Sequence, residues 1–331
     1  KLKVRKECET INMLDGMLDG FISPSCLQCL GLAFLAILFL KVIHFVFFMT
    51  LGGKKKLKVR KGSWAVVTGA SDGIGKQFCI QLAKKGYNIC LLSRTKSKLD
   101  AVAELCQKEN VETKVVPVDF SVEPSNYVKV LQSEVAGLDC DVLVNNVGIS
   151  FEHPEYYLDT NDSLDENMVN INIQSMLKMT RAVLPGMVNR KFGYVINLSS
   201  IAGTTPIPLL STYSASKVFV DYWSQAIQEE YKKDGIIVKC ATPMFVATEM
   251  AKMRPSFTVP TPQTLVAGLL NQMGGDVTFS PYWVHRFMQS VIGAMPEGMR
   301  RSYLFNTNKK IRGSALRKKE RARQAAAGGK K

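Results

Sequence analysis

Three side chains suited to proton transfer lie close together in the sequence. Tyr213 and Lys217 are four residues apart, so on a helix they share one face, one turn apart. A phenol titrates at about 10, but a nearby ammonium group favours the phenolate and lowers that pKa. Ser200, thirteen residues upstream, is able to hydrogen-bond the same substrate oxygen. The trio predicts a general acid at neutral pH; the alternative is a spacing without function on an amphipathic helix.

The elements that must position these residues alternate between strand and helix. Short apolar runs rich in β-branched residues predict six strands, at 63–68, 87–93, 111–119, 141–144, 193–199 and 236–243. Helical patterns separate them, including a long one at about 164–189 that contains Asn170 and Asn172 and one from Tyr213 to Gly235. This alternation predicts an α/β fold, a doubly wound parallel sheet of the Rossmann type.

A glycine-rich turn follows the first predicted strand and precedes the first predicted helix. Its glycines have the spacing G-x-x-x-G-x-G, which lets the backbone turn tightly and approach a pyrophosphate at the helix N-terminus. The turn residues expected to contact a dinucleotide are Gly69, Ser71, Asp72, Gly73, Ile74 and Gly75.

The end of the second predicted strand indicates which dinucleotide binds. Dinucleotide sites often place a carboxylate there for the ribose 2′-hydroxyl, but this chain has Ser93 followed by Arg94. A carboxylate would repel a 2′-phosphate, whereas an arginine can hold it. The sequence therefore predicts NADPH over NADH, with a solvated loop arginine as the alternative. Asp119, at the end of the third strand, is expected to meet the adenine edge.

Residues 63–250 resemble the short-chain dehydrogenase/reductase family. The resemblance rests on T-G-x-x-x-G-I-G, on N-N-x-G at 145–148, and on a serine followed by Y-x-x-x-K, in that order and spacing. It implies that Tyr213 is the proton donor and that Ser200 steadies the substrate carbonyl. It also implies that Lys217 binds the nicotinamide ribose and lowers the Tyr213 pKa. Asn172 matches the helix asparagine that holds a proton-relay water in this family.

Further site residues follow from the same resemblance. Ser199 is a rival to Ser200, but the thirteen-residue spacing to Tyr213 favours Ser200. Val147 stands where alanine is usual and Met244 where glycine is usual; the second change affects how the loop 243–248 cradles the nicotinamide. The full set expected to contact the cofactor is Gly69, Ser71, Asp72, Gly73, Ile74, Gly75, Arg94, Asp119, Asn146, Tyr213, Lys217, Val246 and Thr248.

Residues 27–51 form the one long apolar run, and its length suffices to span a bilayer. Lys41 near mid-span costs about 2.5–3.5 kcal/mol, which the surrounding Leu, Ile, Phe and Val outweigh. A tilted span or an in-plane anchor fits as well, and a buried helix of a soluble protein is the alternative. The basic cluster 54–61 follows directly, so the positive-inside rule keeps the rest of the chain on the cytosolic side.

The formal net charge of +15 is concentrated in two flanks. Residues 53–61 carry six basic and no acidic side chains, and residues 309–331 carry ten basic and one acidic. The rest of the chain is neutral, which weakens a nucleic-acid function and suits contact with an anionic membrane surface. The tail is interpreted as disordered and solvated. Eight scattered cysteines and three dispersed histidines predict no metal site.

The expected organisation is a flank at 1–26, a membrane anchor at 27–51, a basic linker at 52–62, an NADP-binding catalytic domain at 63–250, a substrate loop with C-terminal helices at 251–305, and a basic tail at 306–331. Within it, 253–262 is interpreted as a mobile substrate loop. The apolar segment 282–295 is interpreted as a membrane-associated surface helix, in preference to a core helix or part of a lipid tunnel.

The membrane segment, the basic tail and the stretches 145–150 and 245–248 resemble one branch of the family. That branch is the microsomal very-long-chain 3-oxoacyl-CoA reductases, which also includes 17β-hydroxysteroid dehydrogenases. The resemblance implies an endoplasmic-reticulum enzyme that uses NADPH to reduce a 3-oxoacyl-CoA in fatty-acid elongation. A steroid substrate, a non-catalytic lipid-binding scaffold and a soluble enzyme are the alternatives. Expected partners are the acyl-CoA or steroid, membrane lipid, other elongation enzymes and a second copy of the chain.

Overall fold

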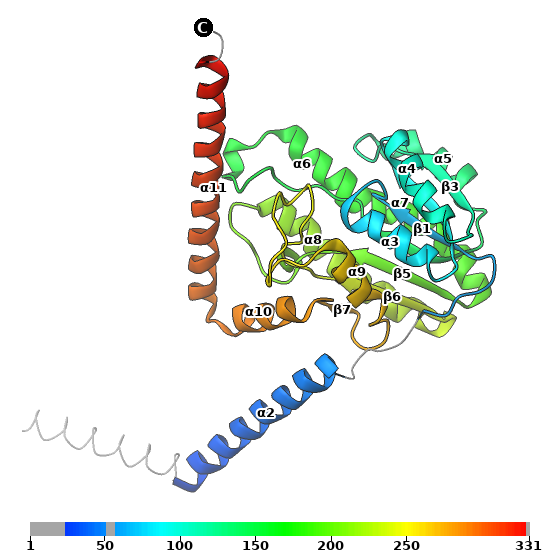
Figure 1. The fold of residues 1–331 in the computed structure, drawn as a ribbon. Coiled ribbons are helices and arrows are strands. Elements are labelled where there is room, and N and C mark those ends of the chain that lie inside the picture. Colours follow the sequence, from blue (N-terminus) through cyan, green and yellow to red (C-terminus); the bar gives the residue numbers. More distant parts are fainter. Residues whose placement is uncertain (1–23, 51–56, 329–331) are drawn as a thin grey trace, which may run out of the picture. The chain divides into compact units, whose positions relative to one another are not determined.

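The computed structural model of the chain describes residues 24–50 and 57–328 (Figure 1). The chain separates into two compact units, with the division between Gly52 and Gly53. The described part of the first unit is one helix, α2 (Pro24–Thr50). Its segment Pro24–Ile43 is long and apolar enough to cross a membrane. The apolar run is therefore helical from 27 to 50, and Leu51 lies outside the described residues.

The second unit is built on a seven-stranded parallel sheet in the order β3-β2-β1-β4-β5-β6-β7. The strands are β1 (Trp64–Thr68), β2 (Asn88–Ser93), β3 (Thr113–Pro117), β4 (Cys140–Asn145), β5 (Gly193–Leu198), β6 (Ile236–Ala241) and β7 (Thr278–Phe279). The six predicted strands are confirmed with small shifts at their ends. β7 was not predicted, because it is two residues long and lies in no apolar run.

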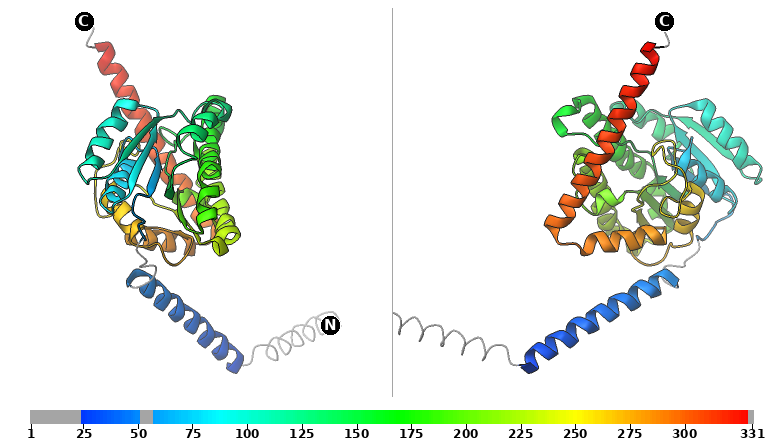
Figure 2. Two further views of the ribbon diagram at one scale, coloured as in Figure 1. Left: turned by 90° about the vertical axis from the view of Figure 1, so that its right-hand side faces the viewer. Right: turned by 60° about the vertical axis from the view of Figure 1, so that its left-hand side comes forward.

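Helices cover both faces of this sheet (Figure 2). The helices of this unit are α3 (Gly73–Ala83), α4 (Lys96–Gln107), α5 (Pro124–Glu134), α6 (Asp162–Val169), α7 (Ser175–Arg190), α8 (Ser211–Tyr231), α9 (Pro262–Leu270), α10 (Trp283–Ala294) and α11 (Glu297–Gly328), and not all of them lie on the sheet. Successive side chains of a strand point to opposite faces, so Val67 joins the core under α3 and α4 while Val66 joins the core under α5 and α7. The doubly wound fold is confirmed.

The strand order places the functional edge of the sheet. The order in which successive strands are added reverses between β1 and β4, and ligands of doubly wound folds bind beyond the carboxyl ends of strands at such a switch point. β5 lies between β4 and β6, with which it pairs along its length. The segments that leave β1, β4, β5 and β6 therefore meet at one edge, where the predicted site residues lie.

The C-terminal segment is helical, so the interpretation of the tail as disordered is wrong for the described residues. α11 runs from Glu297 to Gly328, and Arg and Ala in its second half are strong helix formers. Pairs four residues apart, such as Arg301 with Glu297, add support along its surface. Asn308 and Arg312 join it to the catalytic unit. A run of charged residues is compatible with either state, and these contacts favour the helix.

The basic linker also differs from expectation, because residues 57–62 already belong to the catalytic fold. Leu57 is buried in the core under α3. The Arg60 guanidinium donates Nε hydrogen bonds at 3.0 Å to both oxygens of Asp141, whose side chain is fully buried. These bonds raise the pKa of Arg60 above its usual value. The folded domain thus begins before Ser63, and Arg60 neutralises Asp141 instead of presenting its charge to a membrane.

We expect Arg60→Met to lower the free energy of unfolding by about 3 kcal/mol, because it leaves the buried Asp141 carboxylate without a counterion. The value is at the low end of the range for breaking a buried pair, since the Arg60 side chain is 39% exposed. Denaturant unfolding of the purified protein measures it. Lys61→Met, which removes an exposed charge from the next residue, is the control and is expected to change stability by under ~0.5 kcal/mol. Equal stabilities of the two variants would contradict the assignment.

Candidate active site

Tyr213 and Lys217 lie one turn apart near the start of α8, as their spacing predicts. Lys217 is 6% exposed, and its Nζ donates a 2.9 Å hydrogen bond to the carbonyl oxygen of Leu198, the last residue of β5. The same Nζ lies 5.7 Å from the centre of the Tyr213 ring. The helix N-terminus therefore brings the phenol and the ammonium together beside the end of β5.

The structure distinguishes the two candidate serines. Ser199 is buried and donates its hydroxyl to the carbonyl oxygen of Lys217 at 2.7 Å, so it has a structural bond. Ser200 follows at the start of a short 3₁₀ turn, where its Oγ accepts from the Ala202 N–H at 3.2 Å. The Ser200 hydroxyl also lies close enough to the Tyr213 phenol to lower the pKa of that phenol. This geometry supports Ser200 as the partner of Tyr213.

The pKa of Tyr213 shifts in the direction opposite to the expectation. Burial raises the pKa of the phenol, and the nearby Ser200 hydroxyl only partly offsets that effect. Burial also lowers the pKa of Lys217 to about 8. The expected lowering of the Tyr213 pKa by Lys217 is therefore not found, because burial is the largest cause of the shift in each group.

Asn172 occupies an irregular turn in the long helix between β4 and β5. The predicted single helix is α6 and α7 joined by a π-helical segment, Asn170–Gln174. Asn172 is 3% exposed; its Oδ1 accepts from the Ile149 N–H at 2.8 Å, and its Nδ2 donates to Ser216 Oγ at 2.9 Å. π-Helical turns inside α-helices are frequent at functional sites. The segment points Asn172 toward α8, while Asn170 bonds the Ser121 carbonyl instead.

The glycine-rich turn has the shape of a phosphate cradle. Gly69 and Gly73 have φ values of +64° and +54°, a region that side-chain-bearing residues rarely adopt. A Cβ on Gly75 would lie 2.1 Å from the Gly69 carbonyl oxygen. Asp72 caps α3 by accepting from the Gly73 N–H at 2.6 Å. Ile74, by contrast, packs its side chain into the core, so only its backbone is available to a dinucleotide.

The end of β2 carries no carboxylate, as the sequence indicated. Ser71 of the turn hydrogen-bonds Ser93 at 3.0 Å, and Arg94 beside them is exposed. Partial burial of Asp119 raises its pKa. Hydrogen bonds from Ser121 and the charge of Arg94 lower it by more, so the pKa lies below its usual value. Arg94 and Asp119 therefore lie near one another, in the positions proposed for the 2′-phosphate and the adenine edge.

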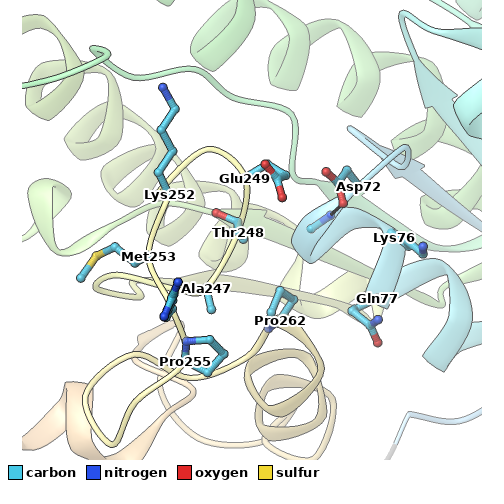
Figure 3. A pocket seen from close by; sticks show the side chains of 12 residues that line it. Asp72, Lys76, Gln77, Ala247, Thr248, Glu249, Lys252, Met253, Pro255 and Pro262 are labelled. Carbon is cyan, nitrogen blue, oxygen red and sulfur yellow. Dashed lines mark hydrogen bonds between the residues drawn. The ribbon is translucent and has the colours of Figure 1, made fainter. Parts of the chain in front are cut away.

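The loop after β6 closes the other side of the turn. Thr248 lies beside Gly73, whose added Cβ would be 3.3 Å from the threonine methyl. Both residues line a cavity of about 460 Å³ that opens between the turn and the loop (Figure 3). Val246 is buried at the base of this loop. Asn146 fixes the turn from β4, donating Nδ2 to the Thr68 carbonyl oxygen at 2.9 Å.

His285 holds the loop after β6 in place, a role that was not predicted. Its Nδ1 accepts from the Met244 N–H at 3.2 Å, and its Nε2 lies 3.0 Å from the Thr258 carbonyl oxygen. Burial lowers its pKa, which favours the neutral ring that these two bonds need. The backbone N–H of Met244, the residue that stands where glycine is usual, is thus hydrogen-bonded to a side chain of α10. No local motif signals a contact across 41 residues.

The sequence and fold place the chain in a known family. The pattern of the family described as short chain dehydrogenase matches residues 63–257. Very-long-chain 3-oxoacyl-CoA reductase of Anas platyrhynchos is 47% identical over 81% of this chain and 86% of that relative. The enzyme of the same name from Homo sapiens is 45% identical over 78% of this chain and 83% of its own length. The chain belongs to the short-chain dehydrogenase family.

Solved structures agree with the fold. A 7β-hydroxysteroid dehydrogenase superposes with a TM-score of 0.69 at 24% identity, covering 76% of this chain and 99% of that one. A metagenomic short-chain oxidoreductase in complex with NADP gives 0.57 at 26% identity, covering 66% and 96%. At 24% identity, the similarity to the 7β-hydroxysteroid dehydrogenase supports the fold and not a shared substrate.

Gly75→Ala is expected to weaken NADPH binding at least about tenfold and to destabilise the fold by about 1–3 kcal/mol, because its Cβ would require the Gly69 backbone to move. NADPH fluorescence titration and thermal unfolding measure the two effects. Gly137→Ala is the matched control, since nothing lies within 4 Å of its added Cβ. Wild-type NADPH affinity in Gly75→Ala would show that the turn does not cradle the cofactor.

The lowered pKa of Lys217 predicts a fall in rate at alkaline pH, the alkaline limb of the pH–rate profile. Its pKa is lowered to about 8, so the ammonium group is present below that pH and is lost above it. Tyr213 keeps its proton over this range because its pKa is raised. We expect kcat for carbonyl reduction to fall as pH rises through about 8. In Lys217→Arg the limb should move upward, because arginine keeps its charge. A limb unmoved in that variant would assign it to another group.

Proposed function

We propose that the chain is an NADPH-dependent reductase that converts a 3-oxoacyl-CoA to a 3-hydroxyacyl-CoA in very-long-chain fatty-acid elongation. The observation that carries the proposal is the grouping of Ser200, Tyr213 and the buried Lys217, whose Nζ lies 5.7 Å from the centre of the Tyr213 ring. This group stands at the carboxyl end of β5 in a chain 41–47% identical to reductases named for that substrate. A pair of hydroxyl groups at this point is suited to a carbonyl oxygen.

The residues at the sheet edge fit NADP(H). The glycine turn leaves room for a pyrophosphate at the N-terminus of α3, and the exposed Arg94 replaces the carboxylate that would repel a 2′-phosphate. Solved relatives at 26% identity or lower include complexes with NADP and with NADPH. When bound, the nicotinamide supplies the hydride for the carbonyl carbon.

The chain's own side chains manage the oxygen and the proton. Ser200 and Tyr213 hold the keto oxygen, and Tyr213 gives up its phenolic proton as negative charge develops there. Lys217 places a positive charge beside the ring, which stabilises the phenolate that remains. Asn172 acts through its bonds to Ile149 and Ser216, which fix the loop after β4 against α8.

We place the enzyme at the endoplasmic-reticulum membrane with the catalytic unit in the cytosol. The apolar helix α2 supports a membrane anchor, and the exposed Lys58 and Lys61 support the cytosolic side. α10 adds an exposed apolar stripe of Trp283, Phe287 and Val291, spaced four residues apart, which suits a lipid surface. Other elongation enzymes and a second copy of the chain are the proposed protein partners.

NADPH oxidation by the detergent-solubilised full chain tests the function. A long-chain 3-oxoacyl-CoA is expected to be turned over, and Tyr213→Phe should lower kcat at least about 100-fold because the proton donor is removed. NADH in place of NADPH is the cofactor control. A 17-ketosteroid is run in parallel, and turnover of the steroid alone would move the protein to steroid metabolism. Equal rates in wild type and Tyr213→Phe, or no turnover of either substrate, would favour a non-catalytic lipid-binding scaffold.

A further inference from the structure

Two loops stand on either side of the carboxyl end of β5, which Ser200 follows closely. β5 lies between β4 and β6, so the segments that follow β4 and β6 stand on either side of its carboxyl end. Glu152 belongs to the first segment and Lys252 to the second. Their side chains approach to 3.9 Å between Oε1 and Nζ, although they are 100 residues apart in the chain. This ion pair therefore joins the loop after β4 to the loop after β6.

α11 brings a second ammonium group to the same carboxylate. Lys319 Nζ lies 2.8 Å from Glu152 Oε2 and 3.2 Å from Nε2 of His153. The charges of Lys319 and Lys252 hold the pKa of Glu152 below its usual value, against a small effect of burial. One exposed carboxylate thus faces two cations that come from different elements of the fold.

The position of Lys319 is fixed by the packing of α11. Arg312, two turns earlier, forms ion pairs with Glu155 and Asp159 and stacks 5.2 Å from the Tyr156 ring. Asn308, one turn before that, donates to the Pro208 carbonyl oxygen at 2.8 Å. Spacings of four and seven residues put Asn308, Arg312 and Lys319 on one face. Lys319 is therefore held on the side of α11 that contacts the catalytic unit.

Lys252 is constrained as well. Its φ is +52°, a left-handed backbone that is uncommon for a residue with a side chain. Its backbone N–H donates to the Thr248 carbonyl oxygen at 2.9 Å, which fixes it within the loop after β6. Figure 3 shows its side chain extending away from the turn residues Asp72 and Lys76. The ammonium group is thus directed away from the proposed cofactor turn.

We propose that Lys252 and Lys319 form a subsite for the phosphate groups of coenzyme A, with Glu152 as the counterion that a phosphate displaces. The proposal rests on the proposed function and deepens it. Exposed carboxylate–ammonium pairs are weak, so exchange for a more highly charged phosphate is favourable. The pantetheine arm lets the keto group reach Ser200 while the phosphates stay at the entrance. Lipid headgroups carry the same phosphate chemistry, and the test separates the two sources.

The measurement is the ratio of kcat/KM for a 3-oxoacyl-CoA to kcat/KM for the same 3-oxoacyl group on pantetheine, which lacks the nucleotide phosphates. The double variant Lys252→Ala, Lys319→Ala is expected to lower this ratio about tenfold, the scale of one charge-assisted hydrogen bond. Lys309→Ala with Lys310→Ala removes the same charge from exposed positions of α11 and is expected to leave the ratio unchanged.

Glu152→Gln provides a test of opposite sign. It removes the competing carboxylate, so the ratio should rise about two- to threefold. A fall would mean that Glu152 only holds the loops, and the subsite would be wrong. An unchanged ratio in the double lysine variant also overturns the proposal. Binding of the double variant to phosphatidylserine and phosphatidylcholine vesicles separates the two phosphate sources. If the double variant keeps its kcat/KM ratio but loses its preference for phosphatidylserine vesicles, the two lysines bind lipid headgroups and the proposal is overturned.

Two controls separate this proposal from those it depends on. No turnover of either thioester by wild type would refute the proposed function itself, whereas equal losses with both thioesters would refute the subsite alone. The KM for NADPH is measured in every variant with the pantetheine thioester. A rise in that KM for Lys252→Ala would assign the lysine to the cofactor, because Lys252 also lines the cavity beside Gly73.

Discussion

The hydroxyl of Thr68 joins the two strands on which the whole site depends. Thr68 is fully buried at the end of β1, and its Oγ1 donates to the Val144 carbonyl oxygen at 3.2 Å. The same oxygen accepts from the N–H groups of Asn146 and Val147 at 3.0 and 3.1 Å. β1 and β4 are the strands between which the order of successive strands reverses. A single side chain therefore fixes the glycine turn, which leaves β1, relative to the polar loop that leaves β4.

That polar loop also contacts Asn172 and Lys217. Gly148 lies against Asn172 and Lys217, because an added Cβ would be 3.2 Å from Asn172 Oδ1 and 3.3 Å from Lys217 Nζ. Asn172 then bonds both backbone groups of Ile149 and the hydroxyl of Ser216 on α8. The glycine turn, the loop after β4, the π-helical segment and α8 thus form one hydrogen-bonded series. The buried side chains of Thr68, Asn172, Ser216 and Lys217 in this series all form hydrogen bonds, so their geometry is preorganised.

The strands and the motifs at their ends could be predicted because both are local signals. A buried parallel strand is a short apolar run, and parallel strands bring their carboxyl ends to one edge, so residues such as Asn146 and Ser200 were placed correctly. Contacts made by distant segments were not predictable. Arg312 meets Glu155 across 157 residues, and composition alone gave a disordered tail where this contact anchors a helix. Local periodicity holds no information about such a pair.

Electrostatics at the site show the same limit in another form. Spacing alone placed Lys217 beside Tyr213, and from proximity we expected a lowered phenol pKa. Burial, which depends on the whole fold, raises that pKa and lowers the pKa of the lysine. For a reductase this is consistent chemistry, since a proton donor must hold its proton until charge develops on the substrate oxygen. The ammonium group near the ring then stabilises the phenolate as it forms.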